Sequence, residues 1–194
     1  MKKIFLVLLL LNLNFTHVFA VEPDVFVQST VNRASEILTK NIPQEEKISK
    51  LKEIAKETVD IRGVGFYSLG VNRKNLNEEQ KIKYFKLFEA YFLKSFSSRL
   101  SEYTNPEIDV QNKEVLNEKY TIVNSILKAT KERPEIKITW RVYTKDPNNP
   151  LIRDLIIEGL SLARTQKEEF ASILNSNNND INALFKVLKE FSQE

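Results

Sequence analysis

The chain of 194 residues contains no cysteine, one histidine and one methionine. His17 and Met1 both lie within the first twenty residues. Residues 21–194 therefore offer no nucleophile of the Ser-His-Asp or Cys-His type, no zinc site built from nitrogen and sulfur ligands, no haem ligation by histidine or methionine, and no disulfide. We expect no catalytic residues, no metal site and no cofactor, and a domain that is held together by burial of apolar surface.

The first twenty residues have the pattern of a secretory signal peptide. Lys2 and Lys3 precede an apolar run over residues 4–11, and Val18 and Ala20 occupy the −3 and −1 positions of a cleavage site. The run is shorter than the roughly 20 apolar residues that a membrane-spanning helix needs, and no later stretch approaches that length. We expect residues 1–20 to be removed after about Ala20. Residues 21–194 are then expected to form one soluble domain without a membrane tether.

The charge of the remaining chain is close to balanced. Without Lys2 and Lys3, 27 basic and 26 acidic side chains remain, and the two signs are interspersed. No arginine-rich run with interleaved aromatic residues is present, so nucleic acid is not an expected partner.

Apolar residues recur at helical spacing in the first half of the chain and again near its end. This period predicts helices over residues 23–38, 43–59, 60–70 and 77–103, and two more that begin near residues 165 and 180. The segments 77–80 and 165–168 have the capping-box pattern that opens a helix, and Asp180 is suited to cap the last one.

Between residues 107 and 159 the period changes to two, which is typical of strands. Strands are predicted over residues 107–110, 118–130, 135–144 and 151–159, joined by short turns. Consecutive strands with short connections form antiparallel meanders. The fold class predicted is therefore α+β, with an antiparallel sheet of about four strands packed against several helices.

One predicted helix carries a dense aromatic face. The segment KYFKLFEAYFLKSF (83–96) has six aromatic residues in fourteen positions, and all six fall within an arc of about 140° on a helical wheel. Such a face can fill an ordinary core. Because aromatic side chains are stiff, it can also line a cavity without collapsing into it.

Enzyme chemistry has few candidates in this sequence. Asp154 and Glu158 are placed on one strand face, where Asp60, Tyr67 or Tyr143 could pair with them, as in small α+β isomerases that use a carboxylate and a tyrosine. The alternative is that these polar groups bind the backbone or neighbouring side chains.

Two stretches carry a family resemblance. Residues 59–100 (VDIRGVGFYSLGVNRKNLNEEQKIKYFKLFEAYFLKSFSSRL) and 156–174 (IIEGLSLARTQKEEFASIL), with Trp140-Arg141 between them, resemble the two signatures of the MlaC and toluene-tolerance auxiliary proteins in order and spacing. The chain departs from the family at Pro150 and Arg153, near which an aromatic residue is common, and at 177–179, where asparagines replace a turn glycine. Asparagine tolerates the left-handed conformation that the glycine would supply.

The resemblance implies a soluble periplasmic phospholipid carrier of Gram-negative bacteria. Such a carrier holds the acyl chains of a glycerophospholipid in an apolar pocket with the headgroup outside. It exchanges lipid with an inner-membrane ABC transporter complex, which has a lipid-binding ring subunit, and with an outer-membrane lipoprotein complex, supporting outer-membrane lipid asymmetry. Two acyl chains would cost on the order of 20 kcal/mol to hold in water, at about 0.8 kcal/mol per methylene, so the protein must enclose them almost completely.

We expect this pocket between the aromatic helix and the inner face of the sheet. The predicted lipid-binding residues are Phe66, Leu69, Phe85, Phe88, Phe92, Phe96, Ile122, Ile126, Ile138, Trp140, Val142, Leu155 and Ile157. Tyr84 and Tyr91, at the edge of the aromatic arc, are expected nearer the rim because their hydroxyls need partners.

Two alternatives stay open at the level of sequence. One is a lipid-free periplasmic adaptor that binds envelope proteins through its surface and has a solid core. The other is a small isomerase-like enzyme, which would require a deep polar pocket around Asp60 or Asp154.

Overall fold

The computed structural model describes residues 20–131 and 133–193, so residues 1–19 of the predicted signal peptide lie outside the described part. The described residues form six α-helices, one 3₁₀ helix and five strands. In chain order these are α1 (Pro23–Thr39), α2 (Gln44–Thr58), α3 (Ile61–Ser68), the 3₁₀ helix η1 (Gly70–Asn75), α4 (Glu78–Ser101), β1 (Ile108–Asn117), β2 (Tyr120–Leu127), β3 (Ile136–Tyr143), β4 (Leu151–Ile157), β5 (Leu160–Ser161), α5 (Leu162–Ser176) and α6 (Ile181–Gln193).

The strands form one antiparallel meander in the order β1-β2-β3-β4-β5, which confirms the predicted α+β class. The sheet has five strands where about four were expected. The fifth, β5, pairs with the end of β4 through a tight turn in which Glu158 and Gly159 both adopt positive φ angles, 48° and 85°. β1 is also longer than predicted, with irregularities in register at Val110/Asn112 and Val115/Asn117.

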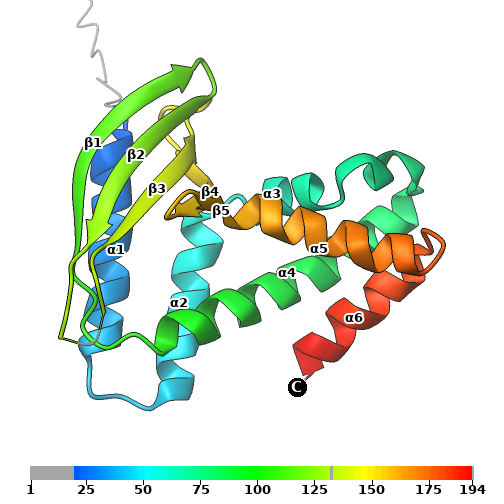
Figure 1. The fold of residues 1–194 in the computed structure, drawn as a ribbon, viewed down its shortest axis with the longest axis horizontal. Coiled ribbons are helices and arrows are strands. Elements are labelled where there is room, and N and C mark those ends of the chain that lie inside the picture. The colour runs from blue at the N-terminus through cyan, green and yellow to red at the C-terminus, as the bar shows by residue number, and fades with distance from the viewer. Residues whose placement is uncertain (1–19, 132, 194) are drawn as a thin grey trace, which may run out of the picture.

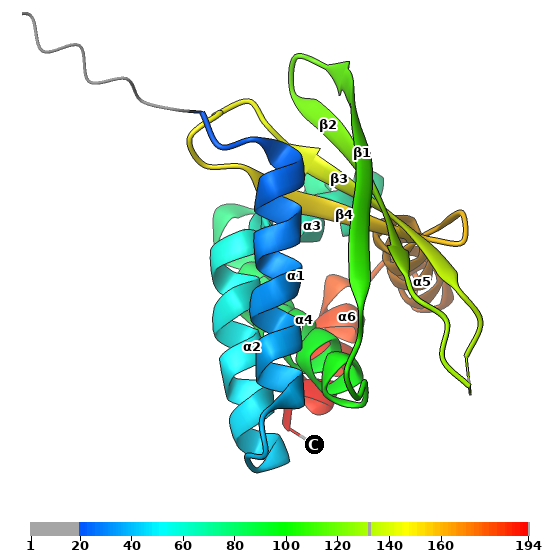
Figure 2. The same cartoon turned by 90° about the vertical axis from the view of Figure 1, so that its left-hand side faces the viewer.

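Helix α1 covers the inner face of the sheet alongside β1 (Figure 2). Val27 and Val31 of this helix are buried. The Gln28 side chain accepts from the Val110 backbone N–H and donates to the Ile108 carbonyl, and Lys113 of β1 forms ion pairs with Glu22 and Asp24. These contacts fix the first helix to the edge strand.

The long helix α4 extends from the sheet across α2 and towards α6, while α5 crosses above it from the end of the sheet (Figure 1). Its start is the predicted capping box: the Asn77 side chain accepts from the Gln80 backbone N–H, and the Gln80 side chain accepts from the Asn77 N–H. This cap satisfies two backbone donors that a helix end would otherwise leave free. Helices α1, α2, α4 and α5 and the sheet surround one interior space.

The glycines of α3 allow close packing at two points. A Cβ atom on Gly65 would lie 2.8 Å from the Phe88 ring, and one on Gly63 would lie 2.4 Å from Asp60 Oδ2. Both distances are shorter than real Cβ contacts allow, so a larger residue would not fit at either position. Each glycine lowers the helix propensity of α3. In return, Gly65 allows contact with Phe88 of α4, and Gly63 allows its N–H to donate to the Asp60 side chain.

The start of α5 differs from the prediction. The helix begins at Leu162 with Ser161 as its N-cap, and the Thr165 hydroxyl donates back to the Ser161 carbonyl inside the first turn. Further along, Asn178 and Asn179 have φ angles of 55° and 59°, which is the left-handed conformation expected there, and Asp180 accepts from the Asn182 N–H at the start of α6 as predicted.

Candidate functional site

An apolar cavity of about 310 Å³ lies between α1, α2, α4, the start of α5 and the inner face of the sheet. One part of its wall comes from the sheet with α1 and α2, and the other part comes from α4 and α5, which cross each other in Figure 1. The volume is at the lower end of the range for small-molecule pockets, roughly 300 to 1,000 Å³.

Helix α4 contributes a row of aromatic rings to this cavity. Phe88, Phe92 and Phe96 are one helical turn apart, with ring centroids 6.1 and 5.6 Å apart. Phe88 is almost fully buried, whereas Phe92 and Phe96 are only half-buried, so the rings become more accessible towards the end of the helix. Phe170 of α5 holds Phe88 in an edge-on contact at 6.1 Å. The rings therefore support each other along this wall of the cavity.

The sheet forms the opposite wall with apolar side chains. Ile138 and Trp140 of β3 face Ile157 and Leu155 of β4 directly across the ladder, and all four line the cavity. The Trp140 indole N–H donates to the Ser125 hydroxyl at 2.8 Å, which in turn donates to the Ile138 carbonyl. Because its only donor is satisfied within the sheet, Trp140 presents an apolar surface.

Two buried threonine hydroxyl groups in the helical wall are satisfied within their own helices. Thr30 donates to the Phe26 carbonyl at 2.9 Å and Thr58 to the Ile54 carbonyl at 2.7 Å, each four residues earlier in its own helix. Neither hydroxyl needs a partner in the cavity, so these positions add little polarity to it.

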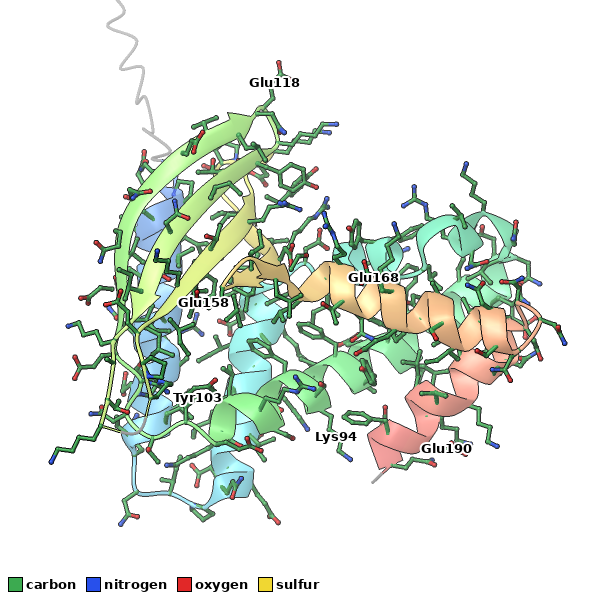
Figure 3. The ribbon with its side chains drawn as sticks, viewed as in Figure 1. Lys94, Tyr103, Glu118, Glu158, Glu168 and Glu190 are labelled. Atoms are coloured by element: carbon green, nitrogen blue, oxygen red, sulfur yellow. The ribbon has the colours of Figure 1, made fainter. Side chains whose placement is uncertain are left out.

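Polar and exposed residues gather at one end of the cavity. Arg99, Tyr103 and Glu169 are exposed lining residues, and Figure 3 shows Tyr103 at the end of α4 beside the sheet. The Tyr91 hydroxyl donates to Gln166 Oε1 at 3.1 Å, and burial raises the pKa of this tyrosine. This polar rim marks the open end, where the apolar interior meets water.

The structure brings together seven of the thirteen residues predicted to bind lipid. The cavity-lining ones are Phe88, Phe92, Phe96, Ile138, Trp140, Leu155 and Ile157, and Tyr91 lies at the rim as expected. Their contact with lipid stays a prediction.

The other six predicted residues lie away from the cavity lining. Ile122 and Ile126 alternate with the buried Thr121, Val123, Ser125 and Leu127, and point to the outer face of the sheet. Leu69 and Val142 are buried in the core, and Phe66 and Phe85 pack on each other with centroids 5.1 Å apart. Tyr84 is not at the rim either, because it is fully buried and donates to the Gly65 carbonyl. Strand alternation separates the two faces, and β2 is apolar on both, so the sequence did not show which face turns inward.

The contribution of the first two helices was not anticipated. Their apolar cavity-lining residues are Val31, Ala34, Leu38, Leu51 and Ile54, and Val59 follows directly after the second helix. The helical apolar stripes in residues 23–38 and 43–59 are the signal for these positions, but a stripe that faces a cavity has the same period as one that faces a solid core.

The carboxylates considered for catalysis are engaged in structural contacts. Asp154 is 5% exposed and accepts from the Ala163 N–H at 3.0 Å and the Ser161 hydroxyl at 2.6 Å. Asp60 caps α3 and binds Arg153 through an ion pair of 2.6 Å. Glu158 is in the exposed turn after β4, where it accepts from the Lys137 N–H. No pair of free carboxylate and tyrosine groups results from this arrangement in the described residues.

The described residues lack the features of a metal site and of a membrane-spanning helix. They contain no group of three or more aspartate, glutamate, histidine or cysteine side chains placed to hold a metal ion. None of the helices in the same residues combines the length and apolar character required to cross a membrane.

Comparison with known proteins places this site in context. The family model described as MlaC protein matches residues 28–190, which include every wall of the cavity. The chain belongs to the MlaC family. Among solved structures, a phospholipid-binding protein from Ralstonia solanacearum, determined in complex with a phospholipid, matches with a TM-score of 0.73 and 17% sequence identity. The match covers 89% of this chain and 98% of that one, and shows that the two share a fold. No curated protein matches the chain.

Proposed function

We propose that this MlaC-family protein is a periplasmic phospholipid carrier, with acyl chains in the apolar cavity and the headgroup at the polar rim. The observation that carries the proposal is the cavity itself. It is walled by a row of phenylalanine rings and an apolar sheet face, and it opens beside Arg99, Tyr103 and Glu169. The Ralstonia structure, which contains a phospholipid, has the same fold and supports this assignment.

The proposed route of the lipid follows from the family. The carrier would exchange phospholipid between an inner-membrane ABC transporter complex and an outer-membrane lipoprotein complex, and so support lipid asymmetry of the outer membrane. Because most of the cavity lining is apolar, and the charged lining residues Arg153 and Asp154 are bound to other protein groups, recognition should depend on the acyl chains more than on the headgroup.

The two alternative functions gain less support. A lipid-free adaptor would be expected to have a solid core, but the apolar side chains of this core surround a cavity of about 310 Å³. An isomerase would need Asp60 or Asp154 free in a polar pocket, but both carboxylates accept hydrogen bonds from backbone N–H groups.

Lipid content is the direct test of the carrier proposal. The mature chain would be purified from a bacterial periplasm without denaturant or harsh detergent, extracted with organic solvent, and analysed by mass spectrometry. We expect phospholipid in the extract at a fixed ratio to protein. Protein prepared in this way that contains no phospholipid would contradict the proposal and favour the adaptor.

A further inference from the structure

A second concave surface lies away from the cavity rim, at the end of the sheet that carries the β1–β2 turn. It is a groove of about 750 Å³ bordered by α3, η1, the start of β2 and the middle of β3 and β4. Four of its lining residues are arginines, contributed by four different elements: Arg62 (α3), Arg73 (η1), Arg141 (β3) and Arg153 (β4). We refer to it as the arginine groove.

The positive charge of the arginine groove is only partly balanced. The four guanidinium groups share it with two carboxylates, Asp60 and Asp154, which leaves a surplus of two positive charges. Arg153 forms an ion pair with Asp60. It also donates to the Tyr120 hydroxyl at 2.7 Å, and its guanidinium carbon lies 3.8 Å from the centroid of the Tyr143 ring. Arg153 is therefore a fixed part of the wall, and the surplus belongs to the other three arginines.

Two of these arginines are exposed, Arg62 over the Phe85 ring and Arg73, and the third, Arg141, has an enclosed donor. Within residues 20–131 and 133–193, no carboxylate forms an ion pair with Arg62 or Arg73. Arg141 lies 3.8 Å from Asp154 Oδ2, beyond hydrogen-bond distance, and its Nε atom is enclosed with no partner among the described residues. A buried donor without an acceptor is costly, so the groove is better satisfied when an anion is present.

We propose that the arginine groove binds a phosphate-type dianion. A phosphate monoester carries roughly 1.5 to 2 negative charges at neutral pH and three acceptor oxygens, which match the surplus charge of the groove and the donors of Arg62, Arg73 and Arg141. The guanidinium fork suits phosphate oxygens in geometry as well as in charge. A single carboxylate, with one charge and two oxygens, would leave part of the groove unsatisfied.

The groove and the rim of the cavity are separate sites. Leu116 and Tyr120 flank the β1–β2 turn at one end of the groove, and Figure 3 shows Glu118 of this turn at the opposite end of the sheet from Tyr103 at the cavity rim. Arg153, Asp154 and Ala163 are the residues that border both spaces. Phosphate binding here does not depend on the carrier proposal, and either can fail alone.

Isothermal titration of the mature protein with inorganic phosphate tests the groove. We expect saturable binding of phosphate, with affinity weakened by roughly tenfold or more in each of Arg62→Gln and Arg73→Gln, because each removes a charge-assisted contact. Both side chains are exposed, so these variants should fold. Lys74→Gln is the matched control: it removes the same charge next to Arg73 but outside the groove, and should bind phosphate like the unmodified protein.

Further titrants separate the sources of the phosphate. Glycerol 3-phosphate stands for a soluble ester, and dihexanoyl phosphatidate for a lipid headgroup, with dihexanoyl phosphatidylcholine as the lipid that lacks a monoester. Arginine-dependent binding of either monoester supports the proposal and identifies the source. Absence of phosphate binding to the unmodified protein, an equal loss in Lys74→Gln, or arginine-dependent binding of a polyglutamate peptide but not of phosphate would each overturn it.

Discussion

Phe92 is the side chain on which the carrier proposal depends most directly. It lines the cavity, stacks on Phe88 and Phe96 of the same helix, and is only half-buried, so a change there should alter the cavity without removing a fully buried core residue. Phe88, by contrast, is 1% exposed, and a charged replacement would unfold the protein for reasons unrelated to lipid.

Replacing Phe92 by aspartate should abolish lipid retention in a folded protein, because an ionised carboxylate in the apolar wall is incompatible with acyl chains. Mass spectrometry of extracted lipid, with circular dichroism to verify folding, measures the effect. Phe85→Asp is the matched control on the same helix: Phe85 is also half-buried but packs on Phe66 outside the cavity. A folded Phe92→Asp protein with undiminished lipid would show that the cavity is not the lipid site.

Tyr84 should make the stability of the folded protein depend on pH in the alkaline range. It is fully buried, its hydroxyl donates to the Gly65 carbonyl at 2.9 Å, and burial raises its pKa above the ordinary value. The folded state therefore favours the neutral hydroxyl. The resulting stability is complete below the unfolded-state pKa of about 10 and is lost as the pH rises from there towards the folded-state pKa.

We expect the free energy of unfolding to fall as the pH rises above about 10. In Tyr84→Phe it should fall less steeply, and the two slopes should differ by up to about 1.4 kcal/mol per pH unit. At neutral pH the same variant should lose about 1 kcal/mol with its hydrogen bond. Urea unfolding between pH 8 and pH 11 measures both effects. Tyr103→Phe, which changes an exposed tyrosine, should follow the unmodified protein, and an identical slope in Tyr84→Phe would contradict the assignment.

At the scale of elements, the junction of β4 and α5 depends on one buried carboxylate. Asp154 accepts from the Ala163 N–H and the Ser161 hydroxyl, and so fixes the first turn of α5 to the sheet. This turn contributes Leu162, Ala163 and Thr165 to the cavity wall. The position of α5 against the cavity is thus set by a side chain on the neighbouring strand.

Asp154→Asn should destabilise the protein by about 1 to 3 kcal/mol, because the amide replaces a charged acceptor and brings a buried donor without a partner. Hydrogen exchange should accelerate at the start of α5 more than in α6. Asp180→Asn makes the same chemical change at the cap of α6, where asparagine is an equally good N-cap, and should cost only a few tenths of a kcal/mol. Equal losses in the two variants would show that Asp154 has no special role.

The elements that the sequence predicted well are those whose ends have local chemical signals. Asn77 and Gln80 form the expected capping box, and Asp180 caps the last helix as expected. The start of α5 was misplaced because Ser161 is an equally suitable cap, and the choice between Ser161 and Thr165 depends on the contact of Ser161 with Asp154 in the folded protein. β1 was predicted too short because residues 111–117 are exposed on an edge strand and have no alternating apolar pattern.

The candidate site was only partly accessible from the sequence for a similar reason. The aromatic face of residues 83–96 was evident, but a ring that lines a cavity and a ring that fills a core have the same spacing, so Phe92 and Tyr84 could not be told apart. Arg99 and Glu169 at the rim were missed because they come from different helices, which meet only in the fold.

At the scale of the whole molecule, cargo and stability should be coupled. The cavity is bounded by the sheet, by α1 and α2, and by α4 and α5, so a ligand that fills it would contact most elements of the fold. A ligand that binds only the folded state stabilises it by about 2.7 kcal/mol at a free concentration one hundred times its dissociation constant.

Delipidated protein should therefore melt about 5 to 10 °C lower than protein with saturating dihexanoyl phosphatidylcholine, given a shift of roughly 2 to 4 °C per kcal/mol for a domain of this size. Differential scanning calorimetry measures the shift. Phe92→Asp should melt at the same temperature with and without the lipid, and a lipid-induced shift that persists in this variant would place the ligand outside the cavity.

The outer edge of β1 gives the molecule a further property. This strand pairs with β2 on one side and with no described strand on the other, and an open strand edge is a template for association between copies. Two breaks in its register, together with Asp109, Lys113 and Glu114, make that edge irregular and charged. Copies of the protein should therefore not associate edge to edge into fibres, even when they are crowded at high concentration.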